Sequence, residues 1–230
     1  MLEIIAASVE DAILIEKGGA DRIELVSALS EGGLTPSYGL MRGVIAAVNI
    51  PVNVMIRPHS KSFVYNEKDL LCMLEDIQQA KALGANGVVF GMLDAQGNIA
   101  VPQLQALLGH CQGLEVTFHR AIDQAKDILA ATKLLATMPI HRVLSSGGPG
   151  QAQTNVAILR QMRDILEPQG KRLLAGSGIS PQNCKNILRA TRAHELHVGT
   201  SVRKNNSAFA GINLAAVKEM VQAYKKACQL

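Results

Sequence analysis

Short apolar runs that are typical of β-strands alternate with amphipathic helical segments eight times along the chain, and this alternation restricts the possible folds. The runs begin roughly 20 to 35 residues apart, which is the spacing that βα units require. No GxGxxG turn follows the first run, which argues against an open, doubly wound sheet. Eight such units predict an α/β fold of the closed (β/α)8 barrel type, the TIM barrel. The eight runs are Leu2–Ser8, Arg22–Leu29, Val52–Pro58, Gly87–Met92, Glu115–Ile122, Arg142–Gly148, Arg172–Ile179 and Glu195–Ser201.

Helix start signals follow several of these runs and support the same organisation. The expected N-terminal residues are Ser8, Thr35 before Pro36, Asn66, and Ser180 before Pro181. A last helix over Ala208–Cys228 is expected to close the chain, and the barrel strands fall within residues 2–201. There is no linker-like or low-complexity segment, so we expect one TIM-barrel domain over residues 1–230.

Composition excludes several classes of function. The net charge is only +4 and the basic residues are scattered, while tryptophan is absent and aromatic residues make up 3%. A nucleic-acid partner is therefore not expected. No apolar stretch has the length of a membrane span, and the N-terminus lacks the basic region of a secretory signal. We expect a cytoplasmic protein with no membrane partner. Its four cysteines, Cys72, Cys111, Cys184 and Cys228, show no zinc-site spacing.

Strand alternation predicts polar side chains inside the barrel. In the fifth run, Val116 and Phe118 are the apolar pair that faces the helices, so Thr117 and His119 face the barrel axis. The same argument applied to three other runs adds Glu24, Asn53, Met55, Arg57, Glu195 and His197 to the inward set. Ionisable groups are costly in a barrel interior unless they are paired, hydrogen-bonded or wet.

Several of these polar residues fall late in their strands, which places them at the mouth, the end of the barrel where the carboxyl ends of the strands meet. Active sites of TIM barrels are built at this end. The candidate catalytic set is Glu24, Arg57, His119, Arg120, Asp123 and His197. A buried charge network that only stabilises the fold is the alternative for each of them, and a local ion pair with Arg120 is the alternative for Asp123.

Glycine-rich loops after the last three strands indicate an anion site at the same end. Loops after strands seven and eight recurrently bind phosphate in barrel enzymes through backbone N–H groups. The candidate anion-binding residues are Ser145, Gly147, Gly176, Gly178, Gly199 and Ser201. Glycine is also needed in tight turns, so each loop alone is a weak signal. In this hypothesis the chain is an enzyme for a small anionic metabolite, a class that includes phosphorylated metabolites. Arg57 and Arg120 clamp the anion, His119 or His197 moves a proton, and Glu24 is the partner acid or base.

Several segments in register resemble the CutC family, the copper homeostasis proteins. They are "ADRIELVSALSEGGLTPSYG", "IPVNVMIRP", "VTFHRAID", "RVLSSGG" and "LLAGSGI". The resemblance runs from about Leu2 to Arg203 and implies a TIM barrel in the cytoplasm, commonly a homodimer or higher homo-oligomer. It also implies binding or handling of Cu(I), for which the mouth offers His119, His197 and Met55 as candidate ligands.

The sequence departs from the family pattern where copper ligands are concerned. Other members can carry cysteines in the first two strands, where this chain has Ile5 and Val26. Cu(I) is soft and prefers thiolate or thioether ligands. The resemblance therefore implies copper as the ligand, whereas the residues of the mouth favour a small anion, and the sequence leaves both hypotheses open.

Overall fold

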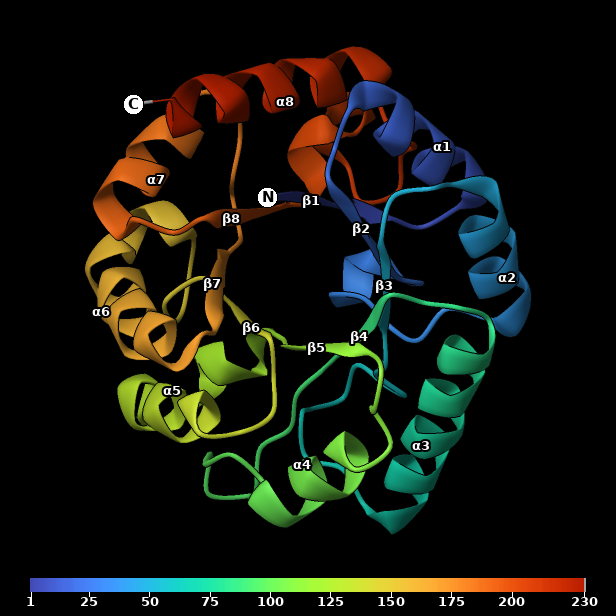
Figure 1. Ribbon diagram of the computed structural model, residues 1–230, viewed down its shortest axis with the longest axis vertical. Helices are drawn as coiled ribbons and strands as arrows, with labels where there is room; N and C mark the ends of the chain where they lie inside the picture. Colours follow the sequence, from blue (N-terminus) through green and yellow to red (C-terminus); the bar gives the residue numbers. More distant parts are fainter. Residues whose placement is uncertain (230) are drawn as a thin grey trace.

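Eight parallel strands pair in sequence order around a ring, and the last strand returns to pair with the first, so that the barrel is closed (Figure 1). The computed structural model describes residues 1–229. The predicted TIM barrel is confirmed. The strands are β1 (Leu2–Ala6), β2 (Arg22–Leu25), β3 (Val52–Met55), β4 (Gly87–Phe90), β5 (Glu115–Phe118), β6 (Arg142–Ser145), β7 (Arg172–Ala175) and β8 (Glu195–Val198).

Helices surround this ring, one after each strand (Figure 1). They are α1 (Val9–Gly18), α2 (Tyr38–Ala47), α3 (Glu67–Ala82), α4 (Val101–Leu108), α5 (Ile128–Ala136), α6 (Val156–Leu166), α7 (Cys184–Thr191) and α8 (Leu214–Cys228). Every strand ends before its predicted run does, and the remaining residues of each run form loops at the mouth. Arg57 and His119 consequently lie just beyond the ends of β3 and β5 rather than inside them.

Three helices begin later than the sequence predicts. Ser37 rather than Thr35 caps α2, since the Thr35 hydroxyl accepts a hydrogen bond from the backbone N–H of Arg57. Ser180 belongs to a turn that precedes α7. Asn213 caps α8 through its side-chain oxygen, so this helix does not extend back to Ala208. The predicted starts at Ser8 and Asn66 are confirmed.

The two faces of each strand have the contacts that alternation predicts. Outward residues such as Ile23, Phe118 and Val198 belong to the main apolar core between the ring and the helices. Inside the ring, Ile5, Val26, Met55 and Val89 form a separate small apolar cluster, which we call the inner cluster. The remaining inward side chains are largely polar and buried.

A network of buried ion pairs fills the barrel interior on the amino-terminal side of the inner cluster. Arg22 donates from Nε to Glu3 at 2.5 Å and from Nη2 to Glu195 at 2.6 Å. Arg142 in turn contacts Glu195 at 3.2 Å and Glu115 at 2.6 Å. Each charge of this network therefore has a partner of opposite sign, which offsets the cost of burying it.

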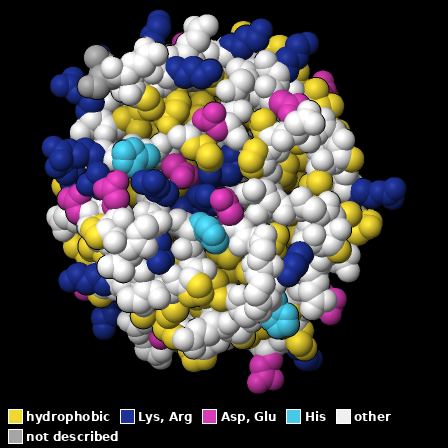
Figure 2. All heavy atoms as spheres, in the orientation of Figure 1, with side chains coloured by type: hydrophobic (Ala, Val, Ile, Leu, Met, Phe, Trp, Pro, Cys, Tyr) yellow, Lys and Arg dark blue, Asp and Glu magenta, His cyan; other side chains and the backbone are white. Residues whose placement is uncertain are grey.

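Among residues 1–229, no helix combines the length and the apolar character that crossing a membrane demands. Figure 2 shows acidic and basic side chains lying together over the middle of one end of the barrel, with basic side chains distributed around the rim.

We predict that Arg22→Met destabilises the protein by about 3–5 kcal/mol, because it leaves the carboxylates of Glu3 and Glu195 buried without their cation. Urea unfolding measures this free energy. Arg172→Met is the matched control, since the Arg172 side chain is half exposed, and we expect a change of less than about 0.5 kcal/mol. Equal stability of Arg22→Met and the parent would show that the barrel does not need this cation.

Candidate functional site at the barrel mouth

A cavity of about 550 Å³ opens at the mouth, among the loops that follow β2, β3, β5, β7 and β8. We call it the mouth cavity. Most of the residues predicted for the site contribute to its walls, namely Glu24, Met55, Arg57, His119, Arg120 and His197. Of the six predicted anion-binding residues, Gly178, Gly199 and Ser201 also line it.

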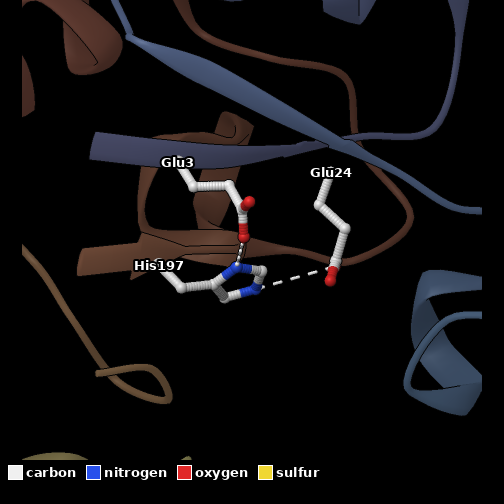
Figure 3. Close-up of side chains that lie close together, drawn as sticks. All are labelled: Glu3, Glu24 and His197. Carbon is white, nitrogen blue, oxygen red and sulfur yellow. Dashed lines mark hydrogen bonds and ion pairs between the residues drawn. The ribbon is translucent and has the colours of Figure 1, made fainter. Parts of the chain in front are cut away.

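Three buried side chains from β1, β2 and β8 meet at one side of this cavity (Figure 3). His197 Nδ1 lies 2.7 Å from Glu3 Oε1, and its Nε2 lies 3.8 Å from Glu24 Oε2. The second oxygen of Glu24 is buried and has no hydrogen-bond partner among residues 1–229. His197 thus stands between one carboxylate that is fully paired and one carboxyl that is not.

The three groups perturb one another. Burial raises the pKa of Glu24 to about 7, and the neighbouring charge of Glu3 acts in the same direction, although His197 opposes both. For Glu3, burial is outweighed by Arg22 and His197, which lower its pKa to about 2. Burial also opposes the charge on His197, but Glu24 and Glu3 raise the pKa of this imidazole. Glu3 is therefore ionised at neutral pH, while Glu24 is poised to exchange a proton.

The contact with Glu3 decides which face of the His197 ring is chemically available. An ionised carboxylate accepts only, so Nδ1 of His197 carries a proton and donates it to Glu3. In the neutral ring, Nε2 then holds a lone pair that points towards Glu24 and the cavity. A carboxylate behind a histidine in this way is the usual support of a histidine that binds a metal or takes up a proton.

His119 differs from His197 in the nitrogen that carries the proton of the neutral ring. The backbone N–H of Ala121 donates to His119 Nδ1 at 3.2 Å, which requires a lone pair on that nitrogen. The proton of the neutral ring therefore lies on Nε2, which is buried, faces the cavity lining and has no partner among residues 1–229. Burial and the charge of Arg57 lower the pKa of His119 to about 3, so the ring stays neutral. His119 is a hydrogen-bond donor to the cavity.

This tautomer argues against the prediction that His119 is a metal ligand. To bind a metal ion through Nε2, the ring would have to carry its proton on Nδ1, facing the N–H of Ala121. Two donors would then be opposed at 3.2 Å. Gly91 leaves room for the ring in this position, because a Cβ atom there would lie 2.6 Å from His119 Nδ1.

Arg57 and Arg120 supply the positive charge of the cavity. The Arg57 guanidinium is buried, donates to the carbonyl oxygens of Glu31 and Gly33 at 2.9 and 3.2 Å, and lies 4.7 Å from the centre of the Phe63 ring. Arg120 is partly exposed and is held by Asp123, with 2.8 Å between Nε and Oδ2.

Asp123 does not line the cavity, in contrast to the prediction, because its carboxylate is occupied by the β6 loop. It accepts hydrogen bonds from the Ser145 hydroxyl at 2.5 Å and from the backbone and hydroxyl of Ser146 at 3.1 and 2.7 Å. The predicted local ion pair with Arg120 is present. Asp123 can influence the cavity only by positioning Arg120.

The structure likewise does not bring Ser145, Gly147 and Gly176 to the cavity as anion donors. The Ser145 hydroxyl donates to Asp123, and the Gly147 N–H donates to the Ser145 hydroxyl oxygen at 2.8 Å. The Gly176 N–H donates to the carbonyl oxygen of Ser145 at 3.0 Å. These three donors therefore form hydrogen bonds within the protein, between the end of β6 and the segments that follow β5, β6 and β7. Ser201, which does line the cavity, donates its hydroxyl to the Ile179 carbonyl at 2.7 Å.

Met55 and Ile5 line the cavity, and both belong to the inner cluster together with Val26. Met55 is buried and packs against aliphatic side chains, so its thioether has the surroundings of a core residue as well as access to the cavity. Ile5 and Met55 therefore give the cavity an apolar surface between its polar walls.

Comparison with known proteins identifies the family to which the chain belongs. The model of the CutC family matches residues 1–202. The chain belongs to the CutC family. A human relative named copper homeostasis protein cutC homolog is 40% identical over 217 residues, which cover 94% of this chain and 79% of the relative. A family protein CutC from Glaesserella parasuis serovar 5 (strain SH0165) is 38% identical over 197 residues, covering 85% of this chain and 80% of that one.

Solved structures agree with this assignment. A structure described as the putative copper homeostasis protein CutC from Streptococcus agalactiae superposes with a TM-score of 0.81 at 29% identity, covering 87% of this chain and 98% of that chain. Phosphoribosyl anthranilate isomerase from Thermotoga maritima gives a TM-score of 0.68 at 16% identity, with 98% of both chains covered. The second likeness shows the barrel fold alone.

Glu3 is the site residue of this CutC-family chain that sequence reasoning missed. A signal was present, since Glu3 lies between Leu2 and Ile4 in an apolar run, and alternation aims it into the barrel. Its contact with His197 connects residues 194 positions apart.

The lowered pKa of His119 predicts a stability that depends on pH. Below its ordinary pKa of 6.5, the unfolded chain takes up a proton that the folded chain refuses until about pH 3. The stabilisation that the neutral His119 ring contributes to the folded state is therefore complete at neutral pH. Below pH 6.5 it decreases by about 1.4 kcal/mol for each pH unit. In urea unfolding, His119→Gln should abolish about 2 kcal/mol of the loss between about pH 7.5 and about pH 5. His110→Gln, at an exposed position, should leave the pH profile unchanged, and an unaltered profile for His119→Gln would show that the folded chain does not hold His119 in its neutral form.

Proposed function

We propose that this protein acts in copper homeostasis in the cytoplasm, and that it meets the copper ion in the mouth cavity at His197, with Glu24 and Met55 as neighbouring ligands. The names of the relatives support the copper role. Family membership over most of the chain supports its transfer. The ion is in this view the cargo of the protein.

The orientation of His197 carries the proposal. Glu3 accepts from Nδ1 at 2.7 Å and leaves Nε2 facing Glu24 at 3.8 Å. One ligand atom from each of Glu3, Glu24 and His197 lies within 4.8 Å of the others. Since the oxygens of Glu3 are engaged by Arg22 and His197, we assign Glu3 the supporting position, and His197 and Glu24 the contact with the ion.

The ligand types fit copper better than a hard cation. Imidazole binds copper in both common oxidation states, and the thioether of Met55 favours Cu(I). Among residues 1–229, no cysteine lines the cavity, and Ile5 and Val26 stand where other family members can have thiols. Thiolates are the ligands that hold Cu(I) most firmly, so we expect weaker binding than a thiolate site would give.

An anaerobic Cu(I) titration in competition with a colorimetric chelator tests the proposal. We expect one ion per chain, with His197→Ala weakening the affinity by about tenfold or more, since an imidazole ligand or its support is typically worth that much. His110→Ala, at an exposed position, serves as the control. Copper binding that His197→Ala leaves intact would place the metal elsewhere, and absence of binding would restrict the copper role to an indirect one.

The position of the inner cluster predicts a gain of function. Ile5→Cys combined with Val26→Cys places two thiols in the cluster that contains Met55. Because thiolate ligands are preferred by Cu(I), the affinity measured by the same chelator competition should rise by more than about tenfold. Ile13→Cys adds an exposed thiol on α1 as the control and should have little effect. If the control gained as much as the double variant, the added affinity would reflect thiols in general rather than the cavity.

Assembly into a homodimer or a higher homo-oligomer remains part of the proposal and rests on the family resemblance. Large apolar side chains at the surface, above all Phe209 at 87% exposure and Leu71 at 63%, are available for contact with a second copy. Sedimentation velocity of the purified chain measures the state directly.

A further inference from the structure

His119 and Arg57 line the mouth cavity on the β3 and β5 side, and each has a buried nitrogen with no hydrogen-bond acceptor at bonding distance among residues 1–229. The two nitrogens are Nε2 of His119 and Nε of Arg57. A buried donor without a partner costs about 1–3 kcal/mol. Both donors carry this cost in the folded chain. This observation indicates that a bound ligand supplies the acceptor atoms.

The donor on His119 is fixed in direction before any ligand binds. The N–H of Ala121 holds Nδ1 as an acceptor, and the Phe63 ring packs edge-on against the imidazole with 5.0 Å between ring centres. The ring is only 3% exposed. Its Nε2–H group therefore needs no reorientation to meet an oxygen in the cavity, which lowers the cost of binding.

Arg57 adds a positive charge that the protein leaves without a counter-ion. Its Nη1 donates to two backbone carbonyl oxygens, and the guanidinium lies over the Phe63 ring. The ion pairs formed within residues 1–229 do not include it, whereas the buried Arg22, Arg142 and Arg203 each contact a carboxylate. A buried cation of this kind is stabilised by a ligand that carries negative charge.

We propose that His119, Arg57 and Arg120 form an oxyanion subsite on the β3 and β5 side of the mouth cavity, which holds a carboxylate or phosphate group of a small organic ligand. Arg120 stands at its rim, where Asp123 and the Ser146 hydroxyl, at 2.8 and 2.9 Å, fix its Nε and Nη2 and leave Nη1 free of those contacts. Charge-assisted hydrogen bonds from two guanidinium groups and a neutral imidazole suit either oxyanion.

The opposite wall limits the remainder of this ligand. Glu24 presents a carboxyl oxygen with no partner among residues 1–229, which disfavours a second anionic group there and favours a hydroxyl or an amine. The volume of about 550 Å³ suits a small molecule. The ligand class is thus a small hydroxy acid, an amino acid, or a hydroxylated phosphate ester. This subsite does not depend on copper, because none of its donors belongs to the proposed metal ligands.

The test uses inorganic phosphate and malonate as separate probes, at an ionic strength held constant with sodium chloride. Nitrogen-15 NMR of the histidine side chains follows Nε2 of His119, and thermal unfolding follows binding. We expect a saturable shift with one probe or both, and the stronger probe identifies phosphate or carboxylate as the preferred group. His119→Phe and Arg57→Met should each raise the dissociation constant by about tenfold or more, as the loss of a charge-assisted or buried hydrogen bond requires. Arg172→Met, at the surface, should not change it.

Three results would overturn the subsite. One is the absence of any saturable shift with either probe. Another is an equal loss of affinity in Arg172→Met and Arg57→Met, which would indicate general attraction to a basic protein. The third is a proton on Nδ1 instead of Nε2 of His119 in the parent protein, a measurement that remains decisive even if Arg57→Met does not fold. Failure of copper binding leaves these results unaffected, so the two proposals are tested separately.

Discussion

The pairing of Arg22 with Glu3 and Glu195 is the interaction on which the rest of the barrel interior depends. It allows three charges to be buried next to one another, because the guanidinium is shared between two carboxylates at 2.5 and 2.6 Å. The same ion pair also affects the mouth cavity, through Glu3. Glu3 uses its second oxygen to hold His197, so an ion pair that looks purely structural also determines which nitrogen of that histidine faces the cavity.

The two histidines of the mouth cavity illustrate how a neighbour, rather than the residue type, assigns chemical roles. His119 and His197 both follow the inward alternation of a barrel strand, and both are nearly fully buried. A backbone N–H opposite Nδ1 makes His119 a donor to the cavity. A carboxylate opposite Nδ1 keeps the proton of the neutral His197 ring on that nitrogen and leaves Nε2 as an acceptor. The cavity therefore has one wall that attracts negative charge and one that attracts protons or cations.

The sequence predicts well whatever depends on local periodicity. Alternation along a strand correctly aims Glu24, Met55 and His197 into the barrel, because facing is decided within a few residues. It fails where the partner is distant along the chain. Nothing in the sequence near Ser145 indicates that its hydroxyl donates a hydrogen bond to Asp123. Likewise, nothing near Thr35 indicates that its hydroxyl oxygen accepts a hydrogen bond from the backbone N–H of Arg57. The tautomers of the two histidines were out of reach for the same reason.

The inner cluster limits which ligand atoms the chain offers to the mouth cavity. Of the inner cluster, Ile5 and Met55 line the cavity, so the chain offers it one soft ligand atom and the hydrogen-bonding walls dominate its chemistry. The two proposals then describe complementary halves of one cavity, a metal ion at His197 and Glu24 and an oxyanion at His119 and Arg57. An anionic group in the second half would supply the negative charge that Arg57 lacks, while Met55 remains the soft ligand atom that the chain itself offers to a metal ion in the first half.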